Sequence, residues 1–171
     1  MVEYNIRSAR AEDLTLLASI EQSAAVLFQN TPYSFLVSAE PLPLEFVKQR
    51  FQAEQVWVAV DQAETVIGYA IANKVDDTLY LQQIDVEPSH GRRGIGSELV
   101  RTVCAWAKRH GYQVVSLSTF REVPWNAPFY AKLGFRMLDE SGLSPGFQQI
   151  RLQEAKAGLP LSARVIMRCK L

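Results

Sequence analysis

Residues 87–99 read Glu-Pro-Ser-His-Gly-Arg-Arg-Gly-Ile-Gly-Ser-Glu-Leu, and they hold three glycines within six positions. An apolar, strand-like run over 79–86 precedes them, and a helical pattern from Ile95 to about His110 follows. Because glycine has no Cβ, backbone N–H groups can crowd around one point, and a helix start adds unpaired N–H groups with partial positive charge. The segment therefore predicts a cradle for an anion such as a phosphate group.

The glycine spacing distinguishes this loop from two other phosphate loops. No lysine follows Gly94 or Gly96 as a Walker-type loop requires, and the order of the glycines reverses the dinucleotide fingerprint. The segment instead resembles the acyl-CoA pyrophosphate loop of the GNAT superfamily of N-acetyltransferases, Arg/Gln-x-x-Gly-x-Gly/Ala. Gly91 departs from the first position of that pattern, but it keeps a backbone N–H that can bind phosphate.

A second segment resembles the next motif of the same superfamily. There an asparagine, a short helix carrying a tyrosine and a closing Gly-Phe follow the pyrophosphate loop, as Asn126, Tyr130, Gly134 and Phe135 do here. Two motifs in the right order are far more specific than either one alone.

Local signals also predict a short helix in this second segment. Asn126 is a favourable N-cap residue, and Gly134 is a natural stop just after a helix. Phe129 and Leu133, four residues apart, are expected to pack inward together, which leaves Tyr130 pointing elsewhere.

Composition limits the class of protein. With 171 residues, 48% of them hydrophobic, the chain is expected to form a single domain over 1–171. Basic and acidic residues balance at 18 each, which argues against nucleic acid as a partner, and no apolar run approaches the roughly 20 residues of a membrane helix. Cys104 and Cys169 imply no disulfide framework and are expected to be small core residues. We expect a cytoplasmic enzyme without a metal, because no His, Cys or carboxylate cluster has metal-ligand spacing.

Periodicity predicts an α/β fold: a mixed, mostly antiparallel sheet flanked by helices on both faces. The expected strands cover 3–8, 55–60, 65–75, 79–86, 114–118, 136–139 and 163–170, and the expected helices cover 12–28, 44–51 and 95–110. The strands up to residue 86 form a meander, and a right-handed crossover makes 114–118 parallel to 79–86. The GNAT resemblance implies the same architecture.

The resemblance implies acetyl-CoA as the cosubstrate and assigns a set of residues to it. Backbone groups of Ile84, Asp85 and Val86 would bind the pantetheine arm, and Asn126 would contact the same arm. The pyrophosphate would lie against Gly91, Arg92, Arg93, Gly94, Ile95, Gly96 and Ser97, with His90 as a donor at the rim.

Acetyl transfer to an amine needs an acid for the leaving thiolate and a base for the amine. The resemblance gives the acid role to Tyr130. The base stays open, because the family often has a carboxylate where this chain has Gln82-Gln83, and amides do not accept a proton near pH 7. Asp85, Glu87 and Glu122 are nearby carboxylates, although the preferred interpretation of each one is a structural or solvated carboxylate. A glutamine could orient water instead, and an acceptor of low pKa would need no strong base.

The predicted function is acetyl transfer from acetyl-CoA to a primary amine of a small molecule or peptide, by direct attack in a ternary complex. Acceptor specificity is expected from the irregular segments 28–46, 120–125 and 141–160, where Arg121 could pair with an acceptor carboxylate. The alternatives are a catalytically lapsed acyl-CoA sensor and an unrelated nucleotide-phosphate binder. No membrane partner is expected, and a homodimer is left open.

Overall fold

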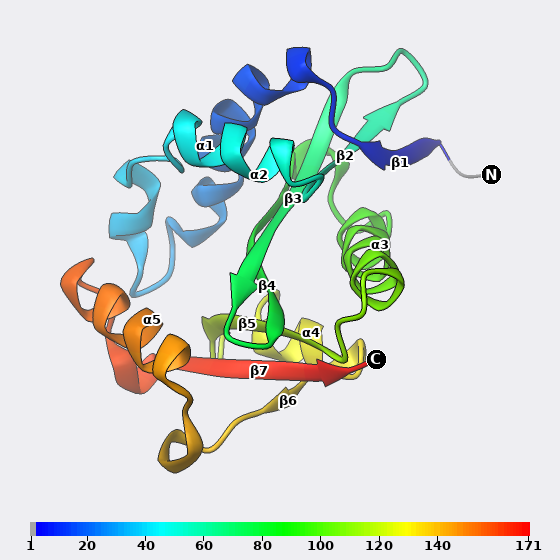
Figure 1. The fold of residues 1–171 in the computed structure, drawn as a ribbon. Helices are drawn as coiled ribbons and strands as arrows, with labels where there is room; N and C mark the ends of the chain where they lie inside the picture. The colour runs from blue at the N-terminus through cyan, green and yellow to red at the C-terminus, as the bar shows by residue number, and fades with distance from the viewer. Residues whose placement is uncertain (1–2) are drawn as a thin grey trace. The chain divides into compact units, whose positions relative to one another are not determined.

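The computed structural model describes residues 3–171, which form one seven-stranded sheet with flanking helices (Figure 1). The strands are β1 (Tyr4–Ser8), β2 (Val56–Asp61), β3 (Val66–Val75), β4 (Thr78–Val86), β5 (Val114–Phe120), β6 (Arg136–Met137) and β7 (Arg164–Lys170). The α-helices are α1 (Leu17–Ala25), α2 (Leu44–Gln52), α3 (Ile95–Arg109), α4 (Ala127–Lys132) and α5 (Pro145–Lys156).

The strand order is β1-β2-β3-β4-β5-β7-β6. Pairing is antiparallel at β1–β2, β2–β3, β5–β7 and β6–β7. β4 and β5 are parallel, with Leu79 opposite Val115 and Tyr80 opposite Ser116. The predicted mixed, mostly antiparallel α/β fold with a central parallel pair is therefore confirmed.

The elements divide into two compact units. Unit 1 contains the described residues up to Ala72 together with Gln83–Val103, and unit 2 contains Asn73–Gln82 and Cys104–Leu171. The prediction that residues 1–171 act as one domain stays a prediction.

In unit 1, α1 and α2 cover one face of β2 and β3 (Figure 1). Because side chains alternate along a strand, every second residue of β2 faces these helices. The buried cluster is Leu14, Leu17, Ile20, Val47, Val56, Val58, Val60, Val66, Tyr69 and Ile71. Full burial of each such aliphatic side chain contributes about 1.5–3 kcal/mol, so this cluster holds the helices on the strands.

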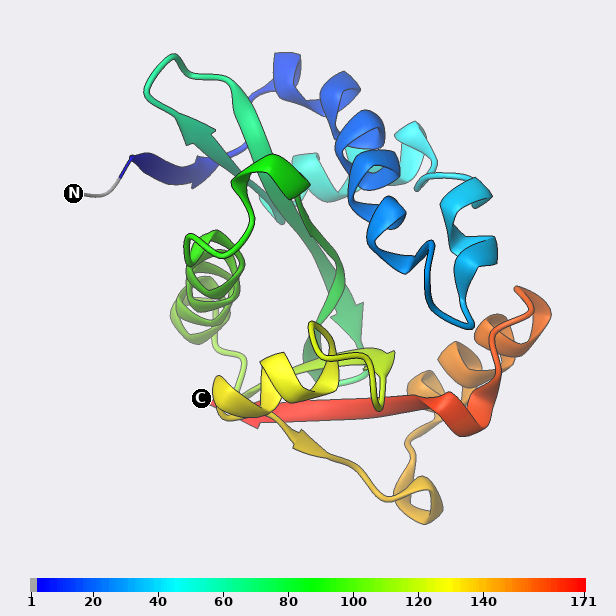
Figure 2. The ribbon, with the colours of Figure 1, turned by 180° about the vertical axis from the view of Figure 1, so that it is seen from behind.

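Unit 2 is built on the long antiparallel pairing of β5 with β7, and α4 lies beside these strands (Figure 2). Tyr80, Phe147 and Ile166 form a buried cluster there. The hydroxyl groups of Thr78 and Ser116 are 2.7 Å apart and buried, which satisfies both within the parallel pair.

Two expectations about helices and one about a strand need correction. Residues 145–156, expected to be irregular within 141–160, form α5. The expected helix over 12–28 is α-helical only over Leu17–Ala25, with 3₁₀ turns at Ala11–Leu16 and Val26–Phe28. β5 also runs two residues beyond the expected 114–118, to Phe120.

Candidate functional site

The glycine loop joins β4 to α3 within unit 1. After a 3₁₀ turn at Pro88–His90, the backbone adopts the left-handed conformation at Arg92 (φ +60) and again at Gly94 (φ +83). α3 then begins at Ile95, which is buried, and runs for 15 residues. The first amides of a helix have no intrahelical acceptor, so this sharp turn presents unpaired donors at the start of α3. The loop therefore has the backbone turn that the sequence analysis expected of an anion cradle.

The basic side chains of the loop are available to a ligand. Arg92 is exposed, and Arg93 is exposed beside Glu3, with Nη1 3.4 Å from Oε2. His90 is half-buried, with its Nδ1 3.2 Å from Ser89 Oγ. His90 and Arg93 also line a hollow of about 330 Å³ beside the loop.

The end of β4 is held very close to β3. A Cβ on Gly68 would lie 3.0 Å from the carbonyl oxygen of Asp85 and 3.3 Å from Cγ2 of Val86. Glu87 N donates a 2.8 Å hydrogen bond to Ile67 O just beyond this approach. Only glycine at position 68 permits this close contact, so it fixes the backbone of the residues assigned to the pantetheine arm.

The carboxyl group of Asp85 is part of a hydrogen-bonded network that sequence reasoning did not find. Tyr69 Oη lies 3.2 Å from Oδ2 of Asp85 and 3.3 Å from Oε2 of Glu21 on α1. Gln83 Nε2 donates to the same Asp85 oxygen at 2.8 Å, and Leu42 N donates to Glu21 Oε2 at 3.0 Å. Two carboxylates from different elements therefore share one phenol hydroxyl.

Burial dominates the electrostatics of this network. The pKa of Asp85 is raised to about 8, mainly by desolvation and further by the charge of Glu21, and the hydrogen bonds from Gln83 and Tyr69 oppose part of that rise. The pKa of Glu21 is also raised, mainly by desolvation. The pKa of Tyr69 is raised strongly for the same reason, so its hydroxyl keeps its proton.

The second motif lies in unit 2, and Asn126 has a different role there from the one expected. Asn126 precedes α4, but its side chain makes no capping hydrogen bond to the helix, contrary to the N-cap prediction. Its Oδ1 instead accepts from Thr119 Oγ1 at 2.7 Å and from Phe120 N at 3.3 Å. Asn126 therefore ties the start of α4 to the end of β5, because these local donors compete successfully with the helix amides.

Tyr130 is the buried aromatic residue of α4, at 8% exposure. Its ring makes edge contacts with Phe129 and Phe135, with centroids 5.1 and 5.7 Å apart. Phe129 and Leu133, expected to point inward, are only half-buried, so that prediction was wrong. Gly134 ends the helix with φ +94, as predicted.

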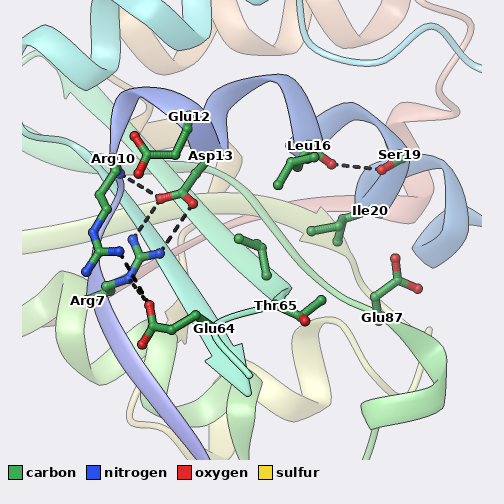
Figure 3. A pocket seen from close by; sticks show the side chains of 11 residues that line it. Arg7, Arg10, Glu12, Asp13, Leu16, Ser19, Ile20, Glu64, Thr65 and Glu87 are labelled. Carbon is green, nitrogen blue, oxygen red and sulfur yellow. Dashed lines mark hydrogen bonds and ion pairs between the residues drawn. The ribbon is translucent and has the colours of Figure 1, made fainter. Parts of the chain in front are cut away.

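Glu87, Glu122 and Arg121 were also named from the sequence as candidate site residues. Glu87 lines a hollow of about 430 Å³ in unit 1 whose arginines are already paired with Asp13 and Glu64 (Figure 3). Glu122 and Arg121 are exposed, and Arg121 Nη1 lies 3.5 Å from Met137 Sδ rather than beside a carboxylate.

Both cysteines are half-buried rather than part of the core, which corrects the prediction for them. Burial raises the pKa of Cys104 to about 12, and the pKa of Cys169 is also raised by burial. No group of three or more His, Cys, Asp or Glu within residues 3–171 is arranged to hold a metal ion. None of the helices in that range is long and apolar enough to cross a membrane.

The mixed sheet with its parallel β4–β5 pair, followed by a glycine loop at the start of α3, defines the α/β class of this fold. The sequence profile of the acetyltransferase (GNAT) family matches residues 23–135. The chain belongs to this family.

Curated relatives match over part of their length. Human N-acetyltransferase 8 is 35% identical over 91 residues, which are 50% of this chain and 40% of the relative. A mouse protein, N-acetyltransferase family 8 member 3, is 33% identical over 91 residues, again 50% of this chain and 40% of the relative. This chain thus matches about 40% of the length of these relatives.

Solved structures share the fold at low sequence identity. A GNAT family acetyltransferase from Staphylococcus aureus has a TM-score of 0.73 at 17% identity, covering 98% of this chain and 99% of that one. The PaiA N-acetyltransferase of Thermoplasma acidophilum, solved with coenzyme A, has a TM-score of 0.69 at 18% identity over 98% and 99%. The ribosomal-protein-S18-alanine N-acetyltransferase of Escherichia coli has a TM-score of 0.66 at 18% identity over 98% and 93%.

Proposed function

We propose that this protein transfers the acetyl group of acetyl-CoA to a primary amine of a small molecule or peptide. The observation that carries the proposal is the loop that turns left-handed at Arg92 and Gly94 and opens directly into α3. Membership of the GNAT acetyltransferase family supports it, since acetyl-CoA is the donor that this family uses.

The coenzyme would be held mostly by backbone groups. The amides of residues 91–97 would bind the pyrophosphate, with Arg92 and Arg93 adding positive charge that complements it. The backbone of Ile84, Asp85 and Val86, fixed by the close approach of Gly68, would bind the pantetheine arm. Asn126 is proposed to contact the same arm through its amide nitrogen, because its Oδ1 is already engaged.

Tyr130 is proposed as the general acid. The acceptor nitrogen attacks the thioester carbonyl carbon, the C–N bond forms, the C–S bond breaks, and the Tyr130 hydroxyl gives its proton to the leaving thiolate. The amine nitrogen loses its surplus proton as the amide forms, which restores the proton balance of the site. Burial of the ring among Phe129 and Phe135 fixes the direction of the hydroxyl, as a positioned acid requires.

A cytoplasmic location fits the two cysteines, which are not joined in a disulfide.

The proposal is tested by binding and turnover together. Calorimetry with acetyl-CoA is expected to give saturable binding, and thiol release is expected with at least one member of a panel of amines, amino acids, polyamines and peptides. Binding without turnover on any acceptor would favour the lapsed acyl-CoA sensor. Absence of binding would overturn both.

A matched pair of glycine variants tests the role of the loop. Gly94→Glu places a bulky anion in the cradle and is expected to abolish acetyl-CoA binding. Gly158→Glu imposes the same strain, because Gly158 has the same φ of +83, but it lies after α5 with nothing within 4 Å of its Cβ position. Equal affinities for both variants would contradict the assignment of the phosphate to this loop.

A further inference from the structure

Acetyl transfer from acetyl-CoA to an amine needs a proton acceptor, and residues 82 and 83 cannot supply one. A primary amine is largely an ammonium ion near neutral pH, and only its neutral form attacks a thioester. Gln83 is an amide, and its Nε2 is committed as a donor to Asp85 at 2.8 Å. Gln83 on β4 thus donates a hydrogen bond to the carboxylate of Asp85, two residues further along the strand.

We propose that the carboxylate of Asp85 accepts the proton of the acceptor ammonium, and that Tyr69 and Glu21 are positioning residues that set when Asp85 can do so. The proposal rests on the proposed N-acetyltransferase function, which supplies the cationic acceptor.

Geometry supports this assignment because one proton is shared among three oxygen atoms. Tyr69 Oη has a single hydrogen, yet it lies 3.2 Å from Asp85 Oδ2 and 3.3 Å from Glu21 Oε2. The hydroxyl can donate to only one of the two carboxylates at a time. When both carboxylates are ionised, one of them faces the phenol oxygen without a proton between them, and that arrangement favours uptake of a proton by the pair.

The three residues come from three separate elements of unit 1, which makes the arrangement rigid. Tyr69 is 1% exposed on β3 and belongs to the main core cluster. Glu21 on α1 is held by Leu42 N at 3.0 Å, and Asp85 lies on β4 beside the Gly68 contact. No element needs to move for the network to form, so the proton acceptor is preorganised.

The chemical step balances as follows. The acceptor R–NH₃⁺ gives one proton to Asp85 and becomes R–NH₂, which attacks the acetyl carbon. The C–S bond breaks, and coenzyme A leaves as the thiol with the proton that the nitrogen loses on amide formation, passed through the acid of the reaction. Asp85 returns its proton to solvent, which accounts for the one proton released per turnover.

The titratable groups acting on Asp85 predict a pH profile. Glu21 from α1 and Tyr69 from β3 face it, and Gln83 is its neutral donor. The pKa of Asp85 is raised to about 8, so the free enzyme gains its base only as pH rises through that region. We expect kcat/KM to increase with pH and to level off above about pH 8, as for the titration of a single group. The rising part of this profile is its acid limb.

Variants of the two positioning residues are expected to move this limb in opposite directions. The negative charge of Glu21 raises the pKa of Asp85, so Glu21→Gln should shift the limb to lower pH. The Tyr69 hydrogen bond lowers that pKa, so Tyr69→Phe should shift the limb to higher pH. Each shift is expected to be about 0.5 pH unit or more. A role limited to packing would not give opposite shifts.

Asp85→Asn is expected to remove the acid limb and to lower kcat by roughly 10²–10⁴-fold. Asp85→Glu, which keeps a carboxylate, is expected to recover part of the lost rate. The loss should be much smaller with an acceptor amine whose ammonium pKa lies below the assay pH, because that amine arrives neutral. Calorimetry should show unchanged acetyl-CoA affinity for all four variants, and thermal melting checks that they fold.

Two outcomes would overturn the inference while leaving the proposed function intact. In the first, the wild-type protein turns over but Asp85→Asn keeps both its rate and its acid limb. In the second, Glu21→Gln and Tyr69→Phe shift the limb in the same direction. Failure of the proposed function is distinct, because the wild type would then release no thiol with any amine.

Discussion

The backbone amide of Gly146 donates a 3.0 Å hydrogen bond to Oδ2 of Asp76, which joins the first turn of α5 to the tip of the β3–β4 hairpin. The hydroxyl of Ser144 donates to the same oxygen. Asp76 adopts the left-handed conformation (φ +52) at this two-residue turn, which directs its carboxylate at the helix N-terminus. A residue of the hairpin therefore supplies the negative charge that the helix itself lacks there.

Gly146→Ala is expected to destabilise the protein by about 1–2 kcal/mol, although alanine favours helices over glycine. Its Cβ would lie 2.6 Å from one carboxylate oxygen of Asp76 and 2.7 Å from Cγ1 of Val75, so the hairpin contact must shift. Urea denaturation measures the change in the free energy of unfolding. Gly142→Ala is the control, because nothing lies within 4 Å of its Cβ position. A Gly146→Ala protein at least as stable as the control would contradict this account.

Gly68→Ala is expected to weaken acetyl-CoA binding by roughly tenfold, an effect of about 1.4 kcal/mol. The new Cβ would push the Asp85 carbonyl, only 3.0 Å away, and would displace the strand segment proposed to bind the pantetheine arm. Calorimetry gives the dissociation constant. Wild-type affinity in the folded variant would remove this segment from the proposed cofactor site.

Tyr130→Phe is expected to lower kcat by roughly 10²–10⁴-fold and to leave the dissociation constant of acetyl-CoA nearly unchanged. The substitution removes the proton donor but keeps the ring contacts with Phe129 and Phe135. Steady-state thiol release measures the effect. Tyr112→Phe serves as the control, since Tyr112 is a half-buried tyrosine of unit 2 outside the two motifs. Equal rates for the two variants would exclude Tyr130 as the acid.

Asp13→Asn is expected to cost about 1–3 kcal/mol of folding stability at neutral pH. The Asp13 carboxylate, 4% exposed, accepts from Arg7 Nη1 at 2.7 Å and from Arg10 N at 2.7 Å. Burial alone would raise the pKa of Asp13, but these hydrogen bonds outweigh it and leave the pKa below its usual value.

The sign of the pH dependence follows from that lowered pKa. Stability from the Asp13 carboxylate is fully present above the unfolded-state pKa of about 3.9 and is lost as pH falls through the lower folded-state value. The stability difference between wild type and Asp13→Asn should therefore shrink below about pH 4. A difference that stays constant from pH 7 to pH 3 would argue against an ionic contribution.

Local signals in the sequence predicted most elements of the fold, because the central strands are continuous apolar runs, buried over most of β2 and β3, and α3 has a regular apolar face. Leu99, Val103, Trp106 and Ala107 are all buried as the helical spacing indicated. The turn at Gly94 could also be predicted, since glycine adopts a left-handed φ without steric cost, whereas the left-handed φ of Arg92 could not.

Features that depend on contacts distant in sequence could not be predicted. Asp76, 70 residues before Gly146, accepts the hydrogen bonds at the start of α5, and this contact could not be foreseen, although Ser144 and Pro145 are a local helix-start signal that the sequence analysis did not use. The sequence around Asn126 predicted that its side chain caps α4, but Asn126 Oδ1 instead accepts a hydrogen bond from Thr119 on β5. Glu21 and Tyr69 escaped notice because neither belongs to a motif, and only the packing of α1 and β3 brings them to Asp85.

The half-buried thiols have a practical consequence for measuring turnover. With a pKa of about 12, roughly one Cys104 side chain in ten thousand is a thiolate at pH 8, the form that attacks disulfide dyes and alkylating agents. The pKa of Cys169 is also raised, so its thiol forms less thiolate as well. A colorimetric dye added during catalysis should thus report liberated coenzyme A over a low protein background, without replacing either cysteine.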